Sequence, residues 1–218
     1  MFFPYKDDNP RILVPVVTYG IIAANMLIFL YQFSLSMSGS EAEAGFIYMF
    51  GLIPAQFNII NLFTSMFLHG GIAHILGNMW FLWIFGDNVE SALGHTRYAL
   101  FYILCGLAAG LAQVIFNIDS TIPMVGASGA IAGVLGAYLL RYPHAQVHVF
   151  VFIFIFFTTI RVPAIIVLGI WFLTQLTNGL ATMGINTTGG VAWFAHIGGF
   201  VAGLGFNYVF QQIKFKEY

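Results

Sequence analysis

A few serine, histidine and asparagine residues stand out because they lie inside long apolar stretches of this chain. Ser128 opens one such stretch, His196 opens another, and His74 and Asn78 lie within a third. A serine hydroxyl becomes a nucleophile when a histidine nitrogen about 2.6–3.2 Å away takes its proton. We therefore predict that Ser128 is a nucleophile and that His196 is its general base.

The same stretches supply hydrogen-bond donors for an oxyanion. His74 and Asn78 are four residues apart, so they share one face of a helix and offer a ring N–H and an amide. Ser128 is expected at a loop-to-helix junction, where free backbone N–H groups and the helix dipole favour negative charge. We predict an oxyanion site made of Asn78, His74 and the backbone N–H of Ser128. His69 is expected to support this site by packing.

Other kinds of site find little support. No Asp or Glu lies within the apolar stretches, which predicts a Ser–His dyad without an acidic third member. His69 and His74 are five residues apart and turned to different helix faces with no carboxylate nearby, so no metal is expected. Cys105 is the one cysteine, which excludes an internal disulfide and a thiolate metal site. We expect no cofactor.

The elements that position these residues should be membrane-spanning helices. The chain of 218 residues is 60% hydrophobic and 7% charged, whereas a soluble domain has about 25% charged residues. Apolar runs recur that are long enough to cross about 30 Å of hydrocarbon. We predict an all-α membrane protein, with residues 1–218 forming one membrane domain. Its six spans are expected near 12–34, 66–86, 97–117, 126–142, 162–180 and 194–212.

The basic residues support this six-span topology. All seven fall in the N-terminus, in a connection after an even-numbered span, or in the C-terminus: Lys6, Arg11, Arg97, Arg141, Arg161, Lys214 and Lys216. The positive-inside rule makes that side cytoplasmic. Spans two, four and six then begin on the outer side, which brings His74, Ser128 and His196 to one membrane face. The net charge of -1 provides no basic face for nucleic acid, so the lipid bilayer is the expected surrounding.

The connections between the spans carry further expectations. Residues 147–160 are almost wholly apolar but too few for a span, so we expect a hydrophobic, interfacial stretch on the cytoplasmic side. Residues 35–65 suit short helices at the outer surface. Residues 118–127 look re-entrant and would lower Ser128 into a water-filled cavity. His95, His144 and His148 are expected to be solvated. The first apolar run is too long for a signal-peptide core and should stay attached.

Small residues are placed where spans four and six would meet. Ser128, Ala132 and Gly136 share one helix face, and His196, Gly199 and Gly203 share another; Gly126 and Gly129 flank the serine. In lipid, such residues let two helix backbones approach closely. Close packing would bring the serine and histidine side chains into contact.

Together these motifs resemble the rhomboid intramembrane proteases. The resemblance runs from Arg11 to about Phe210 and rests on His69 with His74-Ile75-Leu76-Gly77-Asn78, on Gly126-Ala127-Ser128-Gly129, and on Ala195-His196-Ile197-Gly198-Gly199. It implies a six-transmembrane-helix rhomboid-like bundle in which Ser128 and His196 hydrolyse peptide bonds. Its substrates would be single-span membrane proteins, cut near the outer ends of their transmembrane segments. The resemblance also implies that loop 181–193 and span five, with Trp171 and Phe172, gate substrate entry.

Two departures from the family pattern affect the surroundings of the site. Many members carry a Trp-Arg pair in the first outer loop, where this chain reads Asn58-Ile59-Ile60-Asn61-Leu62. Some members stack a tyrosine beneath the base histidine, and that position is Ala132 here. The resemblance therefore leaves open how the first loop is held and what orients the His196 ring.

Two other functions were weighed. A non-proteolytic relative that binds transmembrane segments would not need both Ser128 and His196. A transporter would be expected to show broken helices in both halves and a charged residue within a span, and neither is evident. We predict an intramembrane serine endopeptidase of the plasma membrane, with cytoplasmic termini and an active site that opens outward; the alternative is the binding protein.

Overall fold

Helices form most of the molecule. The structure, a computed structural model, describes residues 2–10, 12–153, 156–183 and 190–212. The helices are α1 (Val16–Ser38), α2 (Ser40–Phe50), α3 (Ile59–Thr64), α4 (Ile72–Leu93), α5 (His95–Phe116), α6 (Ser128–Arg141), α7 (Ala164–Thr182) and α8 (Trp193–Gln212), with 3₁₀ turns at Pro54–Gln56 and Ser65–Phe67. The strands are β1 (Phe2–Asp7), β2 (Gln146–Ile153) and β3 (Phe156–Pro163).

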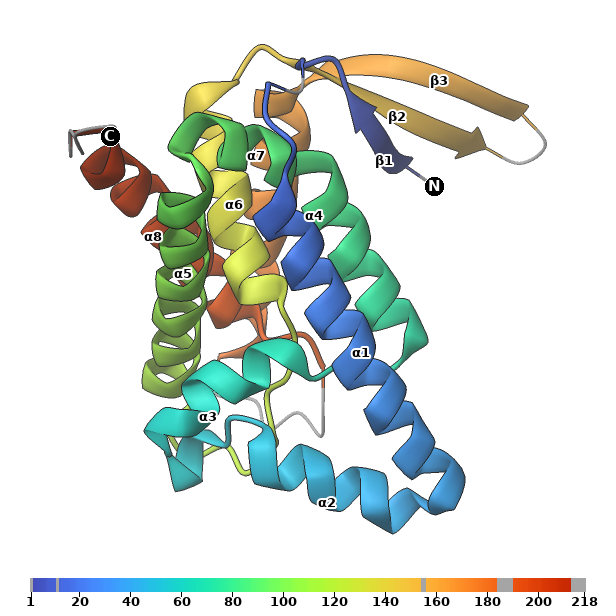
Figure 1. Cartoon of the computed structure of the whole chain (residues 1–218), viewed down its shortest axis with the longest axis vertical. Coiled ribbons are helices and arrows are strands. Elements are labelled where there is room, and N and C mark those ends of the chain that lie inside the picture. Colours follow the sequence, from blue (N-terminus) through green and yellow to red (C-terminus); the bar gives the residue numbers. More distant parts are fainter. Residues whose placement is uncertain (1, 11, 154–155, 184–189, 213–218) are drawn as a thin grey trace.

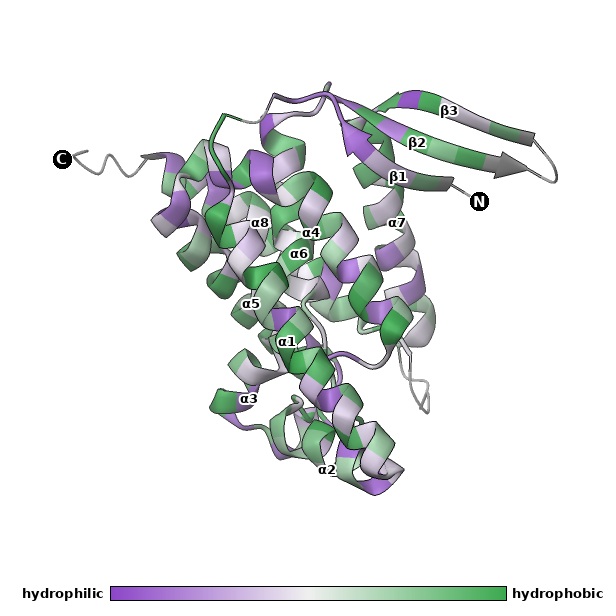
Figure 2. Ribbon diagram, turned by 45° about the vertical axis from the view of Figure 1, so that its right-hand side comes forward, coloured by the Kyte–Doolittle hydropathy of each residue, from purple (hydrophilic) through white to green (hydrophobic). Residues whose placement is uncertain are grey.

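Each predicted span coincides with a helix, namely α1, α4, α5, α6, α7 and α8. Within the described ranges, α1, α5 and α7 are each long and apolar enough to cross a membrane. A fourth crossing is possible if 59–67 and α4, which meet at 89°, count as one broken span. The apolar helix α6 is shorter. The chain is thus a mostly helical, multi-pass membrane protein, and Figure 2 shows hydrophobic residues along all of its long helices.

The second span differs most from its expected bounds. Residues 66–71 belong to a 3₁₀ turn and a bend, because Gly71 takes a φ of 151° that starts α4 only at Ile72. The helix also continues past residue 86, through Asp87 and Glu90. The expected absence of acidic residues therefore does not hold for the whole helix. Both acids lie near its C-terminal end, far from His74 at its start.

Glu90 is buried because it caps another helix. Its carboxylate accepts hydrogen bonds from the backbone N–H of Val17 (2.9 Å) and from the N–H and hydroxyl of Thr18 (2.8 and 2.7 Å). These N–H groups belong to the first turn of α1, whose positive dipole end favours a carboxylate. His95 also contacts Glu90, with 2.6 Å between Nδ1 and Oε1. His95, expected to be solvated, thus joins this network.

A three-stranded antiparallel sheet, in the order β1-β2-β3, contradicts the prediction of an all-α fold. It contains the described residues of the apolar run, 147–153 and 156–160, in which Val147, Val149 and Val151 alternate into the protein core. The run is rich in valine and phenylalanine, which suit a pleated surface, and it is too short for a span. In Figure 1 the β2–β3 hairpin projects from one end of the helical bundle.

The N-terminal strand is attached to this hairpin by charge as well as by backbone pairing. Asp8 follows β1, and its Oδ1 lies 2.6 Å from Nε2 of His148 on β2. His148 is 9% exposed, so the expectation that it is solvated is wrong. The hydrogen bond from His148, helped by the charges of His148, Arg161 and Lys6, lowers the pKa of the Asp8 carboxyl below its usual value.

The opposite end of the bundle carries α2 and α3 (Figure 1), which confirms the prediction of short helices within 35–65. This loop is held without a Trp-Arg pair. Asn61 donates its amide to the carbonyl of Gly51 (2.8 Å), and the Thr64 hydroxyl donates to the carbonyl of Phe50 (2.6 Å). Leu52 pairs with Met124 in both directions, at 3.0 and 2.8 Å, which ties the loop to the segment before α6.

Helices α5, α6 and α8 pack closely at the centre of the bundle. A side chain on Gly199 of α8 would overlap the backbone carbonyl of Gly129 on α6, and Gly203 meets Gly133 in the same way. The two helix backbones can touch because these positions lack a Cβ. The sequence predicted Gly199 and Gly203 for this contact, but on α6 it indicated the face of Ala132 and Gly136 instead of Gly129 and Gly133. This contact fixes Ser128, the first residue of α6, relative to His196 in the first turn of α8.

Candidate active site

Ser128 and His196 form the predicted contact, although 68 residues separate them in the sequence. The Ser128 Oγ lies 2.8 Å from His196 Nε2. This distance lies within the range that proton transfer requires. In Figure 1, α6 begins part-way along the bundle and not at its end, and Ser128, the first residue of α6, is half-buried.

The second nitrogen of His196 contacts Gln175 of α7, a residue that the sequence analysis missed. His196 Nδ1 lies 2.7 Å from Gln175 Oε1. A carbonyl oxygen only accepts hydrogen bonds, so Nδ1 carries the proton and Nε2 presents a lone pair to Ser128. One signal for Gln175 was available: it is a buried amide within the apolar helix α7, where polar side chains are informative.

Two tryptophans surround the His196 ring. Trp171 of α7 lies 5.9 Å from it, centroid to centroid, at an interplanar angle of 34°, and Trp193 lies edge-on at 6.4 Å. Ala132, which occupies the position of the family's stacking tyrosine, is buried in α6. The aromatic neighbours therefore come from α7 and α8 instead of α6.

The proposed gate is only partly within the described residues. Phe172 of α7 stacks on Phe200 of α8 at 4.5 Å between ring centroids. Trp171 contacts Phe200 as well as His196. Residues 184–189 of loop 181–193 lie outside the described part of the chain.

The expected oxyanion donors lie close to the peptide that precedes Ser128. A methyl group on Gly126 would lie 2.8 Å from His74 Nε2 and 3.5 Å from Asn78 Nδ2. His74 Nδ1 accepts a hydrogen bond from the backbone N–H of Gly70 (3.3 Å), which leaves Nε2 of the neutral ring as the donor. Among the described residues, the buried Nδ2 of Asn78 has no hydrogen-bond partner. Both groups can therefore donate to a ligand at this point.

His69 lies behind His74 and is fully buried. Gln32 of α1 holds its backbone from both sides, accepting from the His69 N–H (3.2 Å) and donating to its carbonyl (2.5 Å). The His69 ring meets the His74 ring nearly edge-on at 5.2 Å and Phe29 at 6.4 Å. These contacts fit packing support for His74.

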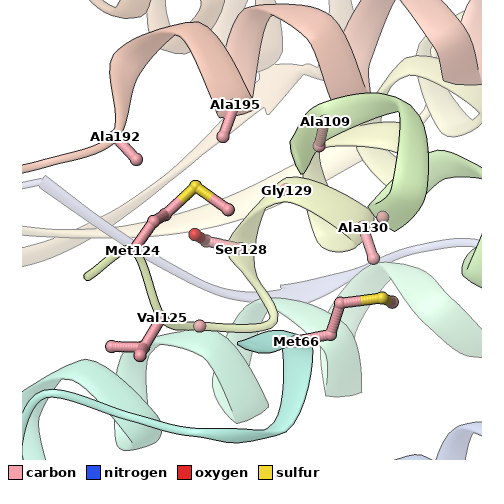
Figure 3. Close-up of a pocket in the computed structure, with 11 residues that line it drawn as sticks. Met66, Ala109, Met124, Val125, Ser128, Gly129, Ala130, Ala192 and Ala195 are labelled. Atoms are coloured by element: carbon pink, nitrogen blue, oxygen red, sulfur yellow. The ribbon is translucent and has the colours of Figure 1, made fainter. Parts of the chain in front are cut away.

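A small cavity of about 10 Å³ adjoins Ser128, enough for about one water molecule. Figure 3 shows the Ser128 side chain between Met66 on one side and Ala192 and Ala195 on the other. Gly126, Gly129 and Met124 also line the cavity. Ser128 therefore borders a space that a small group can enter.

Taken together, these residues can carry out acyl transfer. They provide a hydroxyl in contact with a neutral imidazole, an acceptor that fixes the imidazole tautomer, and an unpaired amide donor, Asn78 Nδ2, near Gly126. Four helices supply these groups: α4 and α6 at their starts, and α7 and α8 at the turns that face each other.

Comparisons with known proteins identify the family of this chain. A family model described as "Rhomboid domain" matches residues 56–213. The chain is 37% identical over 129 residues to Rhomboid protease GluP of Bacillus subtilis, which covers 57% of this chain and 24% of that protein. It is 30% identical over 186 residues to RHOMBOID-like protein 7 of Arabidopsis thaliana, which covers 84% of this chain and 54% of that protein.

A relative with longer coverage is Rhomboid protein 1, mitochondrial, of Saccharomyces cerevisiae. It is 26% identical over 224 residues, which covers 99% of this chain and 58% of that protein. The chain thus spans between about a quarter and three fifths of the length of these relatives.

Proposed function

The chain belongs to the rhomboid family, and we propose that it is an intramembrane serine endopeptidase with Ser128 as nucleophile and His196 as general base. The observation that carries this proposal is the 2.8 Å contact between Ser128 Oγ and His196 Nε2. A protein that only binds transmembrane segments has no need for this contact. A named protease among the relatives supports the same reading.

In the proposed reaction, His196 Nε2 takes the proton of Ser128 as Oγ attacks the scissile carbonyl carbon. The carbonyl oxygen becomes an oxyanion, which accepts from Asn78 Nδ2, His74 Nε2–H and the backbone N–H of Ser128. Loss of one such donor in a soluble protease costs about 2.7–4 kcal/mol of transition-state stabilisation. The unpartnered Asn78 amide supports this role.

The tetrahedral intermediate then collapses to an acyl-enzyme. His196 gives its proton to the leaving amine, and the C–N bond breaks. A water molecule, deprotonated by His196, attacks the ester carbonyl, and Ser128 Oγ leaves with the proton. The cavity beside Ser128 is large enough for that water.

The proposed topology has six crossings, made by α1, α4, α5, α6, α7 and α8, within one membrane domain covering residues 1–218. The basic residues then lie on the cytoplasmic side of a plasma membrane together with both termini and the sheet. The active site opens toward the outer side, at the end that carries α2 and α3. Substrates would be single-span membrane proteins whose transmembrane segments enter the bundle from the bilayer.

The proposed function is tested by labelling the detergent-solubilised protein with a serine-directed fluorophosphonate and mapping the adduct by mass spectrometry. This probe requires no knowledge of the substrate. An adduct on Ser128 that is lost in His196→Ala is the expected result. A folded, accessible protein that gives no adduct would instead indicate the binding protein without proteolytic activity.

Substrate cleavage adds a second test. We expect Ser128→Ala to abolish cleavage of any transmembrane substrate while the protein keeps its melting temperature within a few degrees. Ser34→Ala provides a matched control, because Ser34 is an exposed serine of α1. Cleavage that persists in Ser128→Ala would contradict the assignment of the nucleophile.

A further inference from the structure

We propose that Gln175 is a positioning residue that fixes the tautomer and orientation of His196. It takes the place that a carboxylate occupies in a Ser-His-Asp triad, but it does so as a neutral acceptor. This inference rests on the proposed function, because it assigns a role to Gln175 only if His196 is the base. Two contacts of the Gln175 amide carry it.

The first contact is with His196 itself. Gln175 Oε1 lies 2.7 Å from His196 Nδ1, on the side of the ring away from Ser128. Among the described residues, Ser128 and Gln175 are the hydrogen-bond partners of this ring. An Nδ1–H donated to Gln175 leaves the Nε2 lone pair to accept the Ser128 proton.

The second contact decides which end of the amide faces His196. Gln175 Nε2 donates to the backbone carbonyl of Trp171 (3.1 Å) and also to Thr174 Oγ1 (3.2 Å). A reversed amide would set two carbonyl oxygens against each other and turn the NH₂ group toward His196. That arrangement would place the ring proton on Nε2, where it blocks the base function. The Trp171 carbonyl thus orients Gln175, and Gln175 orients His196.

Burial of Gln175 on α7 would lower the stability of the protein if its amide did not contact His196. Gln175 is 6% exposed, and the other buried residues of α7 are Ala164, Leu168 and Gly179. An amide buried on an apolar helix face lowers stability unless its hydrogen bonds are satisfied. Here both ends of the amide are satisfied, one by its own helix and one by His196. The ring of Trp171, in the preceding turn, packs against the same histidine.

The test compares Gln175→Leu, which removes the acceptor, with Gln175→Glu, which keeps an oxygen at the same distance along the side chain. The readouts are the maximal labelling rate of Ser128 by a fluorophosphonate and the probe concentration that gives half of that rate. In Gln175→Leu the maximal rate should fall about 10- to 100-fold, because the Nδ1–H loses its buried partner. The half-saturating concentration should stay within about twofold. Gln175→Glu should recover most of the rate.

A spectroscopic readout separates positioning from a structural role. Solution ¹⁵N spectra of the histidine-labelled wild type, with His196 assigned by its loss in His196→Gln, should show a protonated Nδ1 and an unprotonated Nε2. In Gln175→Leu the ring should shift toward a mixture of both tautomers. Gln113→Leu serves as a matched control, because Gln113 accepts from the backbone N–H of Ala195 (3.2 Å), next to His196. In Gln113→Leu the maximal labelling rate should stay within about twofold of the wild-type rate, and the His196 tautomer should be the same as in the wild type.

Either measurement can overturn the proposal. A wild-type His196 protonated at Nε2 would refute it, even if Gln175→Leu failed to fold. An unchanged labelling rate and tautomer in a folded Gln175→Leu would refute it as well. If the wild-type Ser128 is not labelled at all, the proposed function fails, while the ¹⁵N spectrum still shows whether Gln175 sets the tautomer.

Discussion

Gly126 lies directly against the His74 ring: a methyl group on its Cα would come within 2.8 Å of both Cε1 and Nε2 of that ring. The residue also has a φ of 128°, which side chains disfavour, and its N–H donates to the carbonyl of Ser65 (2.9 Å). The peptide before the nucleophile can therefore approach both expected oxyanion donors because residue 126 has no side chain.

This relationship predicts the effect of Gly126→Ala. The added methyl group should displace the His74 ring and strain the backbone, lowering the free energy of unfolding by about 1–3 kcal/mol. Fluorophosphonate labelling of Ser128 should slow about 100-fold, since small displacements of catalytic groups have large effects. Thermal unfolding and labelling rates measure the two effects. Gly169→Ala, where an added Cβ meets nothing within 4 Å, should leave both almost unchanged.

Removal of the Asn78 amide should slow the chemical step specifically. In Asn78→Ala the maximal labelling rate of Ser128 should fall about 100- to 1,000-fold, while the half-saturating probe concentration changes little. The reason is that the amide donates to the oxygen only as negative charge develops. Asn178→Ala, at an exposed position of α7, is the matched control. A higher half-saturating probe concentration with an unchanged maximal rate would mean that Asn78 binds the probe and does not stabilise the oxyanion.

The contact between α6 and α8 should depend on Gly199. In Gly199→Ala the new Cβ would overlap the Gly129 carbonyl, so the helices must separate at a cost of about 1–3 kcal/mol. Separation also lengthens the distance between Ser128 and His196, so labelling should slow. The control Gly205→Ala lies on the same helix, where an added Cβ meets nothing within 4 Å. Equal melting temperatures for these two variants would contradict this account of the packing.

The Asp8–His148 pair should make attachment of the N-terminal strand sensitive to acid. Asp8 has a pKa below the ordinary 3.8, chiefly because His148 hydrogen-bonds to its charged form. Since its folded pKa is lowered, the pair stabilises the fold above pH 3.8, and this contribution is lost as the pH falls through the folded pKa. An NMR titration should give an Asp8 midpoint under 3.8 that rises toward 3.8 in His148→Ala. An unchanged midpoint would exclude His148 as the cause.

The Asp8 titration has a control close to the same strand. In His144→Ala the histidine removed lies before β2, and its ring contacts neither Asp8 nor Arg161 in the described hydrogen bonds. The Asp8 midpoint should then stay where it is in the wild type. Above pH 4, where the pair is intact in the wild type, amide hydrogen exchange of β1 should be faster in His148→Ala and unchanged in His144→Ala.

Much of the helical framework could be predicted from the sequence. Long apolar runs form helices in a membrane because every backbone group must be paired within the segment, so the runs alone locate α1, α5 and α7. The ends of the helices are harder to predict, because an apolar run ends at the first charged residue whereas a helix can continue past it. Glu90 illustrates this point: it lies within α4 because it caps α1, a contact that no local pattern reveals. The run 147–160 was equally ambiguous, and its alternating valines form a strand.

The residues proposed for catalysis could also be identified from the sequence. Ser128, His196, His74 and Asn78 are polar groups in apolar surroundings, and helical spacing with topology placed them near one membrane face. Which of their atoms meet was decided by tertiary structure. The backbone contact of Gly129 with Gly199 sets the 2.8 Å distance between Ser128 and His196, and a turn of α7 contributes Gln175 and Trp171 to the His196 ring. Periodicity shows which face a side chain shares within its own helix, whereas partners on other helices depend on how the helices pack. The contact between Gln175 and His196 therefore depends on how α7 packs against α8, which the sequence alone does not show.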